Sequence, residues 1–341
     1  MMRQLLQPLT PLYRGVVQTR NWCYDHQVLR SHRVSVPVVS VGNLSVGGSG
    51  KTPLVEYLST GFQQAGKKVG IISRGYKRKS SGQIIVCEGD GPVSTPERAG
   101  DEPYMLSLLH PEWIIVVDED RAEAAETAVR EYAVDVLLMD DGFQHRKLAR
   151  DVDVVVIPVS HTSDHMRLLP SGDLREPWSS LSRATHIVLR GDVGENLWEK
   201  AEQWIADFSN ATLYRGVKRT VPVLRSRFQD SEKPFEDFDL PPSVFAVTGI
   251  GDPGSFQDAL RASGCSLSGF QAFPDHYSYS PESQHHILTE FHQSGADMLV
   301  MTAKDIVKWD EAVLKENPVY YLPVEFTLEP DLVRDILNAL P

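Results

Sequence analysis

A glycine-rich segment that runs into lysine and threonine is the part of the sequence with the clearest chemical meaning. It follows a β-branched run at residues 36–41 and precedes a helical pattern that starts at Pro53. Glycines let the backbone adopt positive φ and turn its N–H groups toward phosphate oxygens, and the N-terminus of the next helix adds its dipole. The residues predicted to bind the phosphates of a nucleoside triphosphate are Ser45, Val46, Gly47, Gly48, Ser49, Gly50, Lys51 and Thr52.

Context supports this prediction more than the Gly-Lys-Thr triplet does. The general phosphate-loop pattern has glycine where this chain has Ser45, and the triplet alone arises easily by chance. The alternative is an ordinary turn between a strand and a helix, which the four glycines within residues 42–50 disfavour. In the phosphate-loop interpretation, Lys51 contacts the β- and γ-phosphates and Thr52 offers its hydroxyl group to Mg²⁺.

Two neighbouring aspartates, Asp140 and Asp141, follow the apolar run 134–139. An acid at the end of a buried strand beside a phosphate loop reaches Mg²⁺ directly or through its water shell. Aspartate and glycine are also common where a strand simply ends in a turn. Together with the phosphate loop, the pair predicts a magnesium site, and the sequence does not assign separate roles to the two acids.

A third acid, Asp101, precedes a helical run at residues 104–109. Taken alone, it is best explained as the N-cap of that helix. A kinase, however, needs a carboxylate that accepts the proton of the attacking hydroxyl group. An acid at a loop–helix junction, about fifty residues beyond the phosphate loop, is a candidate for that role.

Two arginines occupy loops that could face a ligand. Arg74 follows the run 69–72, at a strand end of the kind where ligands bind in open α/β sheets. Arg175 lies in the long loop 169–177. Arg74 suits an anionic substrate and could equally belong to a solvated loop, and Arg175 could contact substrate or a nucleotide phosphate.

Two features of the C-terminal part bear on the ligand. His276 follows the strand-like run 267–273 and, taken alone, is more typical of a structural histidine. The segment Thr302-Ala303-Lys304-Asp305 is out of frame for the guanine-reading NKxD motif, which favours ATP as the nucleotide.

The elements that must position these residues alternate between short apolar runs and helical stretches, the pattern of parallel strands joined by crossover helices. We predict an α/β fold: a P-loop NTPase-like, doubly wound, mostly parallel sheet, a second, smaller α/β domain and an N-terminal amphipathic helix. The predicted strands lie at residues 36–41, 69–72, 113–117, 134–139, 152–157, 186–189, 244–248, 267–273, 298–302 and 319–322. The predicted divisions are 1–35 for the helix, 36–213 for the P-loop domain, 214–242 for a linker and 243–341 for the C-terminal domain.

Charge is distributed unevenly along the chain. The whole chain carries −12, which disfavours general nucleic-acid binding. The first 36 residues hold five arginines and one acid, a net charge of +4 that leaves −16 for the remainder. From Thr10 and Pro11 onward this basic segment has apolar residues at near-helical spacing. It is therefore either a helix on a lipid surface, with arginines toward anionic headgroups, or a helix docked on its own domain.

Composition limits the remaining classes of protein. The three cysteines have no metal-ligand spacing, which is typical of a reducing compartment, and we expect a cytoplasmic protein. No apolar run approaches the roughly 20 residues that a membrane span requires. Ordinary apolar and charged fractions predict folded domains.

Together these residues closely resemble the tetraacyldisaccharide 4'-kinases, the lipid A 4'-kinases of Gram-negative bacteria. The resemblance covers almost the whole chain. It rests on SVGNLSVGGSGKTP at 40–53, SRGYKRKSSG at 73–82, GDEP at 100–103, DDGFQHRKLARD at 140–151, LPSGDLREP at 169–177, TGIGDP at 248–253 and FPDHY at 273–277. Ser45 in place of glycine is itself typical of this family.

The resemblance implies transfer of the ATP γ-phosphoryl group, with Mg²⁺, to the 4'-hydroxyl of tetraacyldisaccharide 1-phosphate, giving lipid IVA. It further implies that Asp101 is the base, that His276 approaches from the opposite wall of a cleft as its partner, and that Lys51 keeps its phosphate role. It favours a membrane-facing N-terminal helix, and hence a peripheral enzyme at the cytoplasmic face of the inner membrane. A P-loop ATPase and a nucleotide-gated membrane adaptor remain the alternatives.

Overall fold

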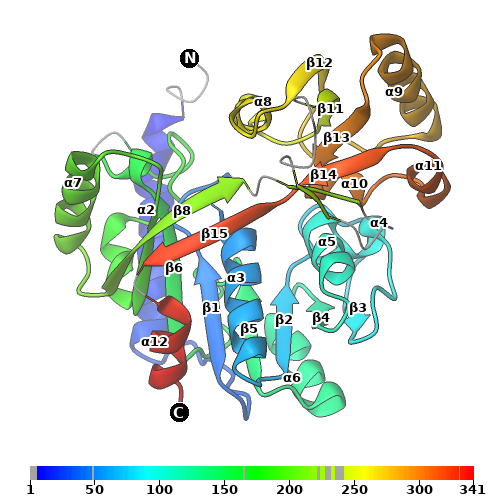
Figure 1. The fold of residues 1–341 in the computed structure, drawn as a ribbon. Helices are drawn as coiled ribbons and strands as arrows, with labels where there is room; N and C mark the ends of the chain where they lie inside the picture. Colours follow the sequence, from blue (N-terminus) through cyan, green and yellow to red (C-terminus); the bar gives the residue numbers. More distant parts are fainter. Residues whose placement is uncertain are drawn as a thin grey trace.

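Two β-sheets organise the chain, and the computed structural model describes residues 6–47, 50–163, 166–220, 223–226, 232–234, 242–329 and 331–341. We call the nine-stranded sheet with its helices the first unit and the six-stranded sheet with its helices the second unit (Figure 1). The predicted α/β class, with a large mostly parallel sheet and a smaller α/β part, is confirmed.

The first sheet has the strand order β15-β8-β7-β6-β1-β5-β2-β4-β3. All pairs between β8 and β4 in this order are parallel. In the described part of the chain, the two outermost strands, β15 and β3, pair antiparallel with β8 and β4. The strands are β1 (Val38–Gly42), β2 (Val69–Ser73), β3 (Ile84–Glu88), β4 (Ile114–Val117), β5 (Val136–Asp140), β6 (Val152–Pro158), β7 (His186–Arg190), β8 (Thr212–Thr220) and β15 (Val324–Glu329).

Helices cover both faces of this sheet, which explains why its central strands are buried along their whole length. Alternate residues of a strand enter different cores: Val39 packs with the α3 side, and its neighbour Val38 packs with the α6 side. The helices of the first unit are η1 (Gln7–Leu9), α2 (Thr10–Asp25), α3 (Lys51–Gln64), α4 (Pro96–Ala99), α5 (Asp101–Leu109), α6 (Arg121–Tyr132), η2 (Val159–His161), η3 (Trp178–Arg183), α7 (Glu195–Ala206) and α12 (Leu332–Ala339).

The second sheet has the order β10-β9-β14-β13-β11-β12, with β11 to β14 parallel and the β9–β10 hairpin antiparallel at one edge. Its strands are β9 (Val223–Arg225), β10 (Glu232–Pro234), β11 (Ser243–Thr248), β12 (Ser266–Ala272), β13 (Met298–Thr302) and β14 (Val319–Leu322). Its helices are α8 (Pro253–Ala262), α9 (Pro281–Ser294), α10 (Ala303–Ile306) and α11 (Glu311–Glu316).

The chain crosses between the units twice, which corrects the predicted boundaries. Part of the predicted linker at 214–242 is strand: β8 extends the first sheet to residue 220, and β9 and β10 belong to the second sheet. The predicted C-terminal domain at 243–341 ends early, because β15 returns to pair with β8 and α12 packs on α3. The basic, alternating sequence around β8 is strand-like, and such alternation is typical of a strand near the edge of a sheet, so this part of the predicted linker belongs to the first sheet.

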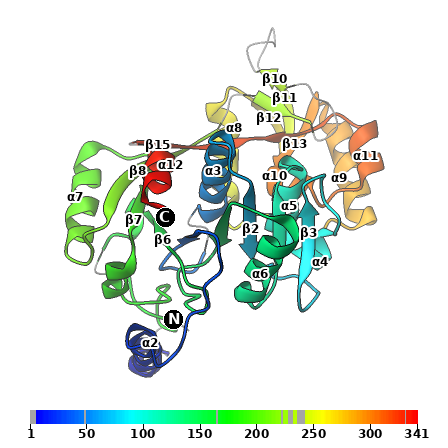
Figure 2. The same ribbon diagram turned by 90° about the horizontal axis from the view of Figure 1, so that it is seen from below.

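The N-terminal segment forms helix α2, which protrudes from the first unit on the side away from the second sheet (Figure 2). One side of the helix is docked, because Val17 and Asn21 are buried. The other side is apolar and exposed, with Leu12 69% and Val16 62% accessible. Among the residues that the structure describes, no helix is long and apolar enough to cross a bilayer.

The return of the C-terminus predicts that the end of the chain stabilises the first unit. Leu332 of α12 is fully buried in the same core as the helix that follows the phosphate loop. Leu332→Ala should therefore lower the free energy of unfolding by roughly 2–5 kcal/mol, since it leaves a cavity. Chemical denaturation would measure this loss. Asn338→Ala, at an exposed position of the same helix, is the control and should change stability by less than about 0.5 kcal/mol.

Candidate active site

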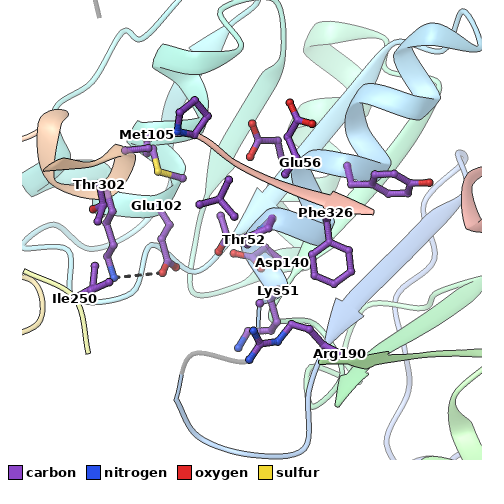
Figure 3. A pocket seen from close by; sticks show the side chains of 18 of the residues that line it. Lys51, Thr52, Glu56, Glu102, Met105, Asp140, Arg190, Ile250, Thr302 and Phe326 are labelled. Carbon is purple, nitrogen blue, oxygen red and sulfur yellow. Dashed lines mark ion pairs between the residues drawn. The ribbon is translucent and has the colours of Figure 1, made fainter. Parts of the chain in front are cut away.

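A cleft of about 2040 Å³ lies between the two units. The first unit contributes the phosphate loop, the end of β5 and residues of α3, and the second unit contributes the turn after β11 and residues around His276. Figure 3 shows Lys51, Thr52, Asp140 and Arg190 gathered on one side, with Glu102 and Ile250 across from them. The strands β1, β2, β4 and β5 run parallel, so their carboxyl ends meet at this edge of the sheet.

The phosphate loop joins β1 to α3 as the sequence predicts. Gly47 and Gly50 both have positive φ, +102° and +88°, so the turn requires residues without a Cβ. Gly50 caps α3, which begins at Lys51, and Val46, Gly47, Lys51 and Thr52 line the cleft. Gly48 and Ser49 of the predicted loop lie outside the described residues.

The start of this loop is fixed by the loop 169–177. Ser45 is buried and bridges Leu174, and the backbone N–H of Val46 donates to the carbonyl oxygen of Asp173 at 2.8 Å. The same loop presents Arg175 to the cleft. Ser45 therefore holds the loop against its neighbour, and it is not among the residues that line the cleft.

Asp140 is the last residue of β5 and Asp141 follows it, and the two carboxyl groups have opposite electrostatic surroundings. Burial, together with the charges of Glu102 and Asp141, raises the pKa of Asp140 to about 7. Burial would also raise the pKa of Asp141, but the cations Lys51 and Arg175 outweigh it and hold that pKa below its usual range. Lys51 Nζ lies 3.5 Å from Asp141 Oδ1, and Arg175 donates to both Asp141 oxygens at 2.9 and 2.7 Å.

The carboxylates and Thr52 fit a hard divalent cation. Asp140 is buried, and its Oδ1 accepts no hydrogen bond from the described part of the chain. A buried carboxylate oxygen without a partner is costly unless a ligand satisfies it. Thr52 lies on the same wall, and oxygen donors of this kind suit Mg²⁺.

Asp101 and His276 meet across the boundary between the units. His276 Nδ1 lies 2.9 Å from Asp101 Oδ2. Asp101 opens α5 without a side-chain capping bond, since Gly100 is the N-cap, so capping does not explain this acid. His276 has a left-handed backbone, φ +65°, and its ring meets Tyr76 edge-on. His276 and Glu102 line the cleft, whereas Asp101 is not among the lining residues.

The two predicted arginines occupy different positions. Arg74 lines the cleft after β2, and Arg175 pairs with Asp141. Arg175 therefore balances a carboxylate of the predicted metal site in this structure.

Sequence reasoning missed several cleft residues. Arg121 is buried after β4, and Arg190 ends β7 against Gly50, whose added Cβ would lie 2.9 Å from Arg190 Cδ. Both follow strands of the first sheet, so the rule that located Arg74 could have found them. Lys304 also lines the cleft, but the sequence of its segment, residues 302–305, carries no signal for such a role.

Comparison with known proteins places this geometry in a family. The family model described as "Tetraacyldisaccharide-1-P 4'-kinase" matches residues 2–341. The chain belongs to the tetraacyldisaccharide 4'-kinase family. Curated members include the tetraacyldisaccharide 4'-kinase of Aquifex aeolicus, 38% identical over 90% of each chain. The one from Desulfotalea psychrophila is 35% identical over 97% of this chain and 95% of its own.

A solved member of the tetraacyldisaccharide 4'-kinase family has the same architecture. The crystal structure of LpxK from Aquifex aeolicus in complex with ATP matches with a TM-score of 0.83 and 35% identity, and the match covers 100% of both chains. The resemblance inferred from sequence motifs is thereby confirmed.

Because the pKa of Asp140 is raised and that of Asp141 is lowered, we expect replacement of each by asparagine to have opposite effects on stability. In the absence of nucleotide and metal, Asp140→Asn should raise the melting temperature at pH 8, because the folded protein no longer has to ionise a buried carboxyl group. The advantage should decline as pH falls from the folded-state pKa of about 7 and vanish below the ordinary aspartate pKa, where the wild-type carboxyl group is protonated in both states.

Asp141→Asn is the matched control, and its effect should have the other sign. It should lower the melting temperature at pH 8, since the folded-state pKa of Asp141 is depressed and its two ion pairs are lost. That deficit should shrink as pH falls below the usual aspartate pKa. Thermal unfolding in a chelating buffer at several pH values measures both, and equal effects of the two variants would contradict the assignment.

Proposed function

We propose that this chain transfers the γ-phosphoryl group of ATP to the 4'-hydroxyl group of tetraacyldisaccharide 1-phosphate, giving lipid IVA in lipid A synthesis. Family membership supports the reaction, and the cleft supports its mechanism. The observation that carries the mechanism is that Lys51 of the phosphate loop and His276 of the second unit line the same cleft, and that His276 is bonded to Asp101 of the first unit.

ATP is the phosphoryl donor in this proposal, bound by the predicted loop Ser45–Thr52 with Lys51 at the β- and γ-phosphates. Thr52, Asp140 and Asp141 would hold Mg²⁺, which neutralises charge on the phosphate oxygens when bound. Arg121 and Arg190 add positive charge beside the loop, and a desolvated guanidinium there favours a phosphate as its counter-ion.

Asp101 is proposed to accept the proton of the 4'-hydroxyl group, with His276 as its hydrogen-bond partner. Burial would raise the pKa of Asp101, but the bond from His276 and the charge of Lys308 outweigh it and keep the pKa below its usual range. The carboxylate is therefore ionised before the substrate arrives. Phosphoryl transfer has a loose transition state, so positioning and charge stabilisation supply most of the rate and the base a smaller part.

The substrate phosphate and the lipid surface would be met by different parts of the molecule. Arg74 in the cleft is a proposed contact for the anionic sugar, and Arg175 would reach either substrate or nucleotide from its place beside Asp141. The exposed apolar face of α2 is proposed to lie on the inner membrane from the cytoplasmic side, with the exposed Arg14 near anionic headgroups, whereas Arg20 is bonded to the carbonyl oxygen of Gln144 on the docked side.

Asp101→Asn tests the chemistry. The amide keeps the shape of the carboxylate but cannot take a proton, so turnover should fall by roughly 10²–10⁴-fold. ATP affinity should be preserved, because the phosphate loop is untouched. The assay follows radiolabelled γ-phosphate into the extracted glycolipid, and Asp90→Asn at an exposed position is the control.

The same assay separates the alternatives. Label that appears only in inorganic phosphate would indicate an ATPase, and label in neither product would indicate a nucleotide-gated adaptor. Near wild-type turnover of Asp101→Asn would remove Asp101 as the base while leaving the kinase activity intact.

Membrane association is tested on the exposed face of α2. Leu12→Gln together with Val16→Gln should weaken sedimentation with vesicles of phosphatidylglycerol and phosphatidylethanolamine roughly tenfold or more, because two side chains lose their apolar burial in lipid. The melting temperature should stay unchanged, since neither side chain is part of the core. Leu197→Gln on α7, another exposed leucine, should leave sedimentation as it is, and equal binding of all three proteins would exclude this face.

A further inference from the structure

Two lysines that follow β13 surround the Asp101–His276 pair. Lys304 lies on α10, and Lys308 lies just after its end. Lys304 Nζ is 3.2 Å from His276 Nε2, and Lys308 Nζ is 3.0 Å from Asp101 Oδ2. Helix α10 belongs to the second unit and packs against α5 of the first. The second unit therefore contributes three side chains, those of His276, Lys304 and Lys308, to the surroundings of the Asp101 carboxylate.

The contact from Lys304 decides which nitrogen of His276 carries the proton. An ammonium group has only donors, so Nε2 must be the acceptor in that contact. The ring hydrogen is then on Nδ1, which donates to Asp101 Oδ2. Lys304 is held for this task between two carboxylates, since its Nζ is 3.6 Å from both Glu102 and Asp275.

Lys308 is held more rigidly. Its side chain is only 7% exposed, and it donates to the carbonyl oxygen of Tyr277 at 3.2 Å. Its Nζ is also 3.8 Å from Asp305 Oδ1 and lies over the ring of Tyr279. A buried ammonium group with this set of partners has a fixed position and an unscreened charge.

Asp305 in turn anchors this arrangement to the second sheet. It is fully buried and accepts from the hydroxyl groups of Thr302 at 2.6 Å and Tyr279 at 3.1 Å. It also accepts a hydrogen bond from the backbone N–H of Gly249 at 3.1 Å. The carbonyl oxygen of Gly249 in turn accepts a hydrogen bond from the backbone N–H of His276. Lys308 and His276 are therefore held by the same network of hydrogen bonds and ion pairs around Asp305.

Both contacts to Asp101 fall on the same oxygen. Oδ2 receives the bond from His276 and the ion pair with Lys308, whereas Oδ1 accepts no hydrogen bond from the residues that the structure describes. The Asp101 side chain is 18% exposed, so part of the carboxylate is open to a ligand.

We propose that Lys304 and Lys308 are positioning residues that fix Asp101 through Oδ2 and so make Oδ1 the atom that takes the proton. This inference rests on the proposed phosphotransfer with Asp101 as base. In that step the 4'-O–H bond breaks and its proton moves to Oδ1. The hydroxyl oxygen uses the freed electron pair to bond the γ-phosphorus, and the β–γ bridging oxygen leaves with ADP.

The charges around Asp101 set the sign of the pH effect. His276 and Lys308 face it from the second unit, with Lys304 and Asp275 one contact further away and Glu102 next to it on α5. Removing the Lys308 ammonium group takes away a cation that favours the ionised base. The acid limb of the pH profile should therefore move to higher pH.

Lys308→Met tests the inference in the full-length protein. We expect kcat to fall by up to roughly 100-fold, since a small displacement of the base is costly, while KM for ATP stays within about twofold of wild type. The acid limb of kcat/KM for the glycolipid should shift to higher pH. Lys308→Arg, which keeps the charge, should restore the position of that limb. Lys304→Met should also lower kcat, and Lys315→Met on α11, at an exposed ion pair, should alter neither quantity.

Each outcome decides the matter. Wild-type kcat and an unmoved acid limb in Lys308→Met and Lys304→Met would overturn the inference while labelled glycolipid from the wild-type enzyme still supports the kinase reaction. A loss of activity that matches the loss of folded protein, with no change in the pH profile, would also overturn it. If Lys308→Met does not fold, Lys304→Met decides by kcat at unchanged KM for ATP. Absence of labelled glycolipid from the wild type would instead refute the proposed function.

Discussion

The parallel direction of the central strands is the constraint on which the whole cleft depends. Because β1, β2, β4 and β5 all end at one edge of the first sheet, the residues that follow them must gather there. These include Lys51, Arg74, Arg121 and Asp140, which lie far apart in the sequence. Burial of the strands on both faces keeps this edge in place.

The charges gathered at this edge would destabilise the fold if other groups did not compensate them. Asp141 is compensated by Lys51 and Arg175, and Asp140 retains one oxygen that accepts no hydrogen bond from the residues described in the structure. The second unit approaches the same edge with its own cations, and the two crossings of the chain at β8 and β15 hold it there. A single hydrophobic core that includes residues of both units, such as Leu106 and Tyr279, adds to this attachment.

Sequence patterns predicted the parts of the fold that depend on local signals. The buried strands and the glycine turn at Gly50 were predictable, because hydrophobic periodicity and the presence of glycine are properties of neighbouring residues in the sequence. The return of β15 to β8 was not, since antiparallel pairing across about one hundred residues leaves no local trace. Motif resemblance identified the family, and it pointed to Asp101 and His276 together. Nothing in the spacing of Lys304 and Lys308 indicated that they would reach Asp101, because that contact exists only once the units are packed.

The two interpretations of the N-terminal helix are compatible, because they concern opposite faces. The inner face is tied to the loop 169–177: the Tyr13 hydroxyl donates to the carbonyl oxygen of Arg175, and Asn21 donates to the buried Glu176. The outer face carries the exposed leucine and valine side chains. Since Arg175 also pairs with Asp141, α2 is connected through this one arginine to the proposed metal site. If the outer face of α2 rests on lipid, as we propose, these contacts would link the membrane-facing helix to the cleft, which suits a glycolipid substrate whose acyl chains remain in the bilayer.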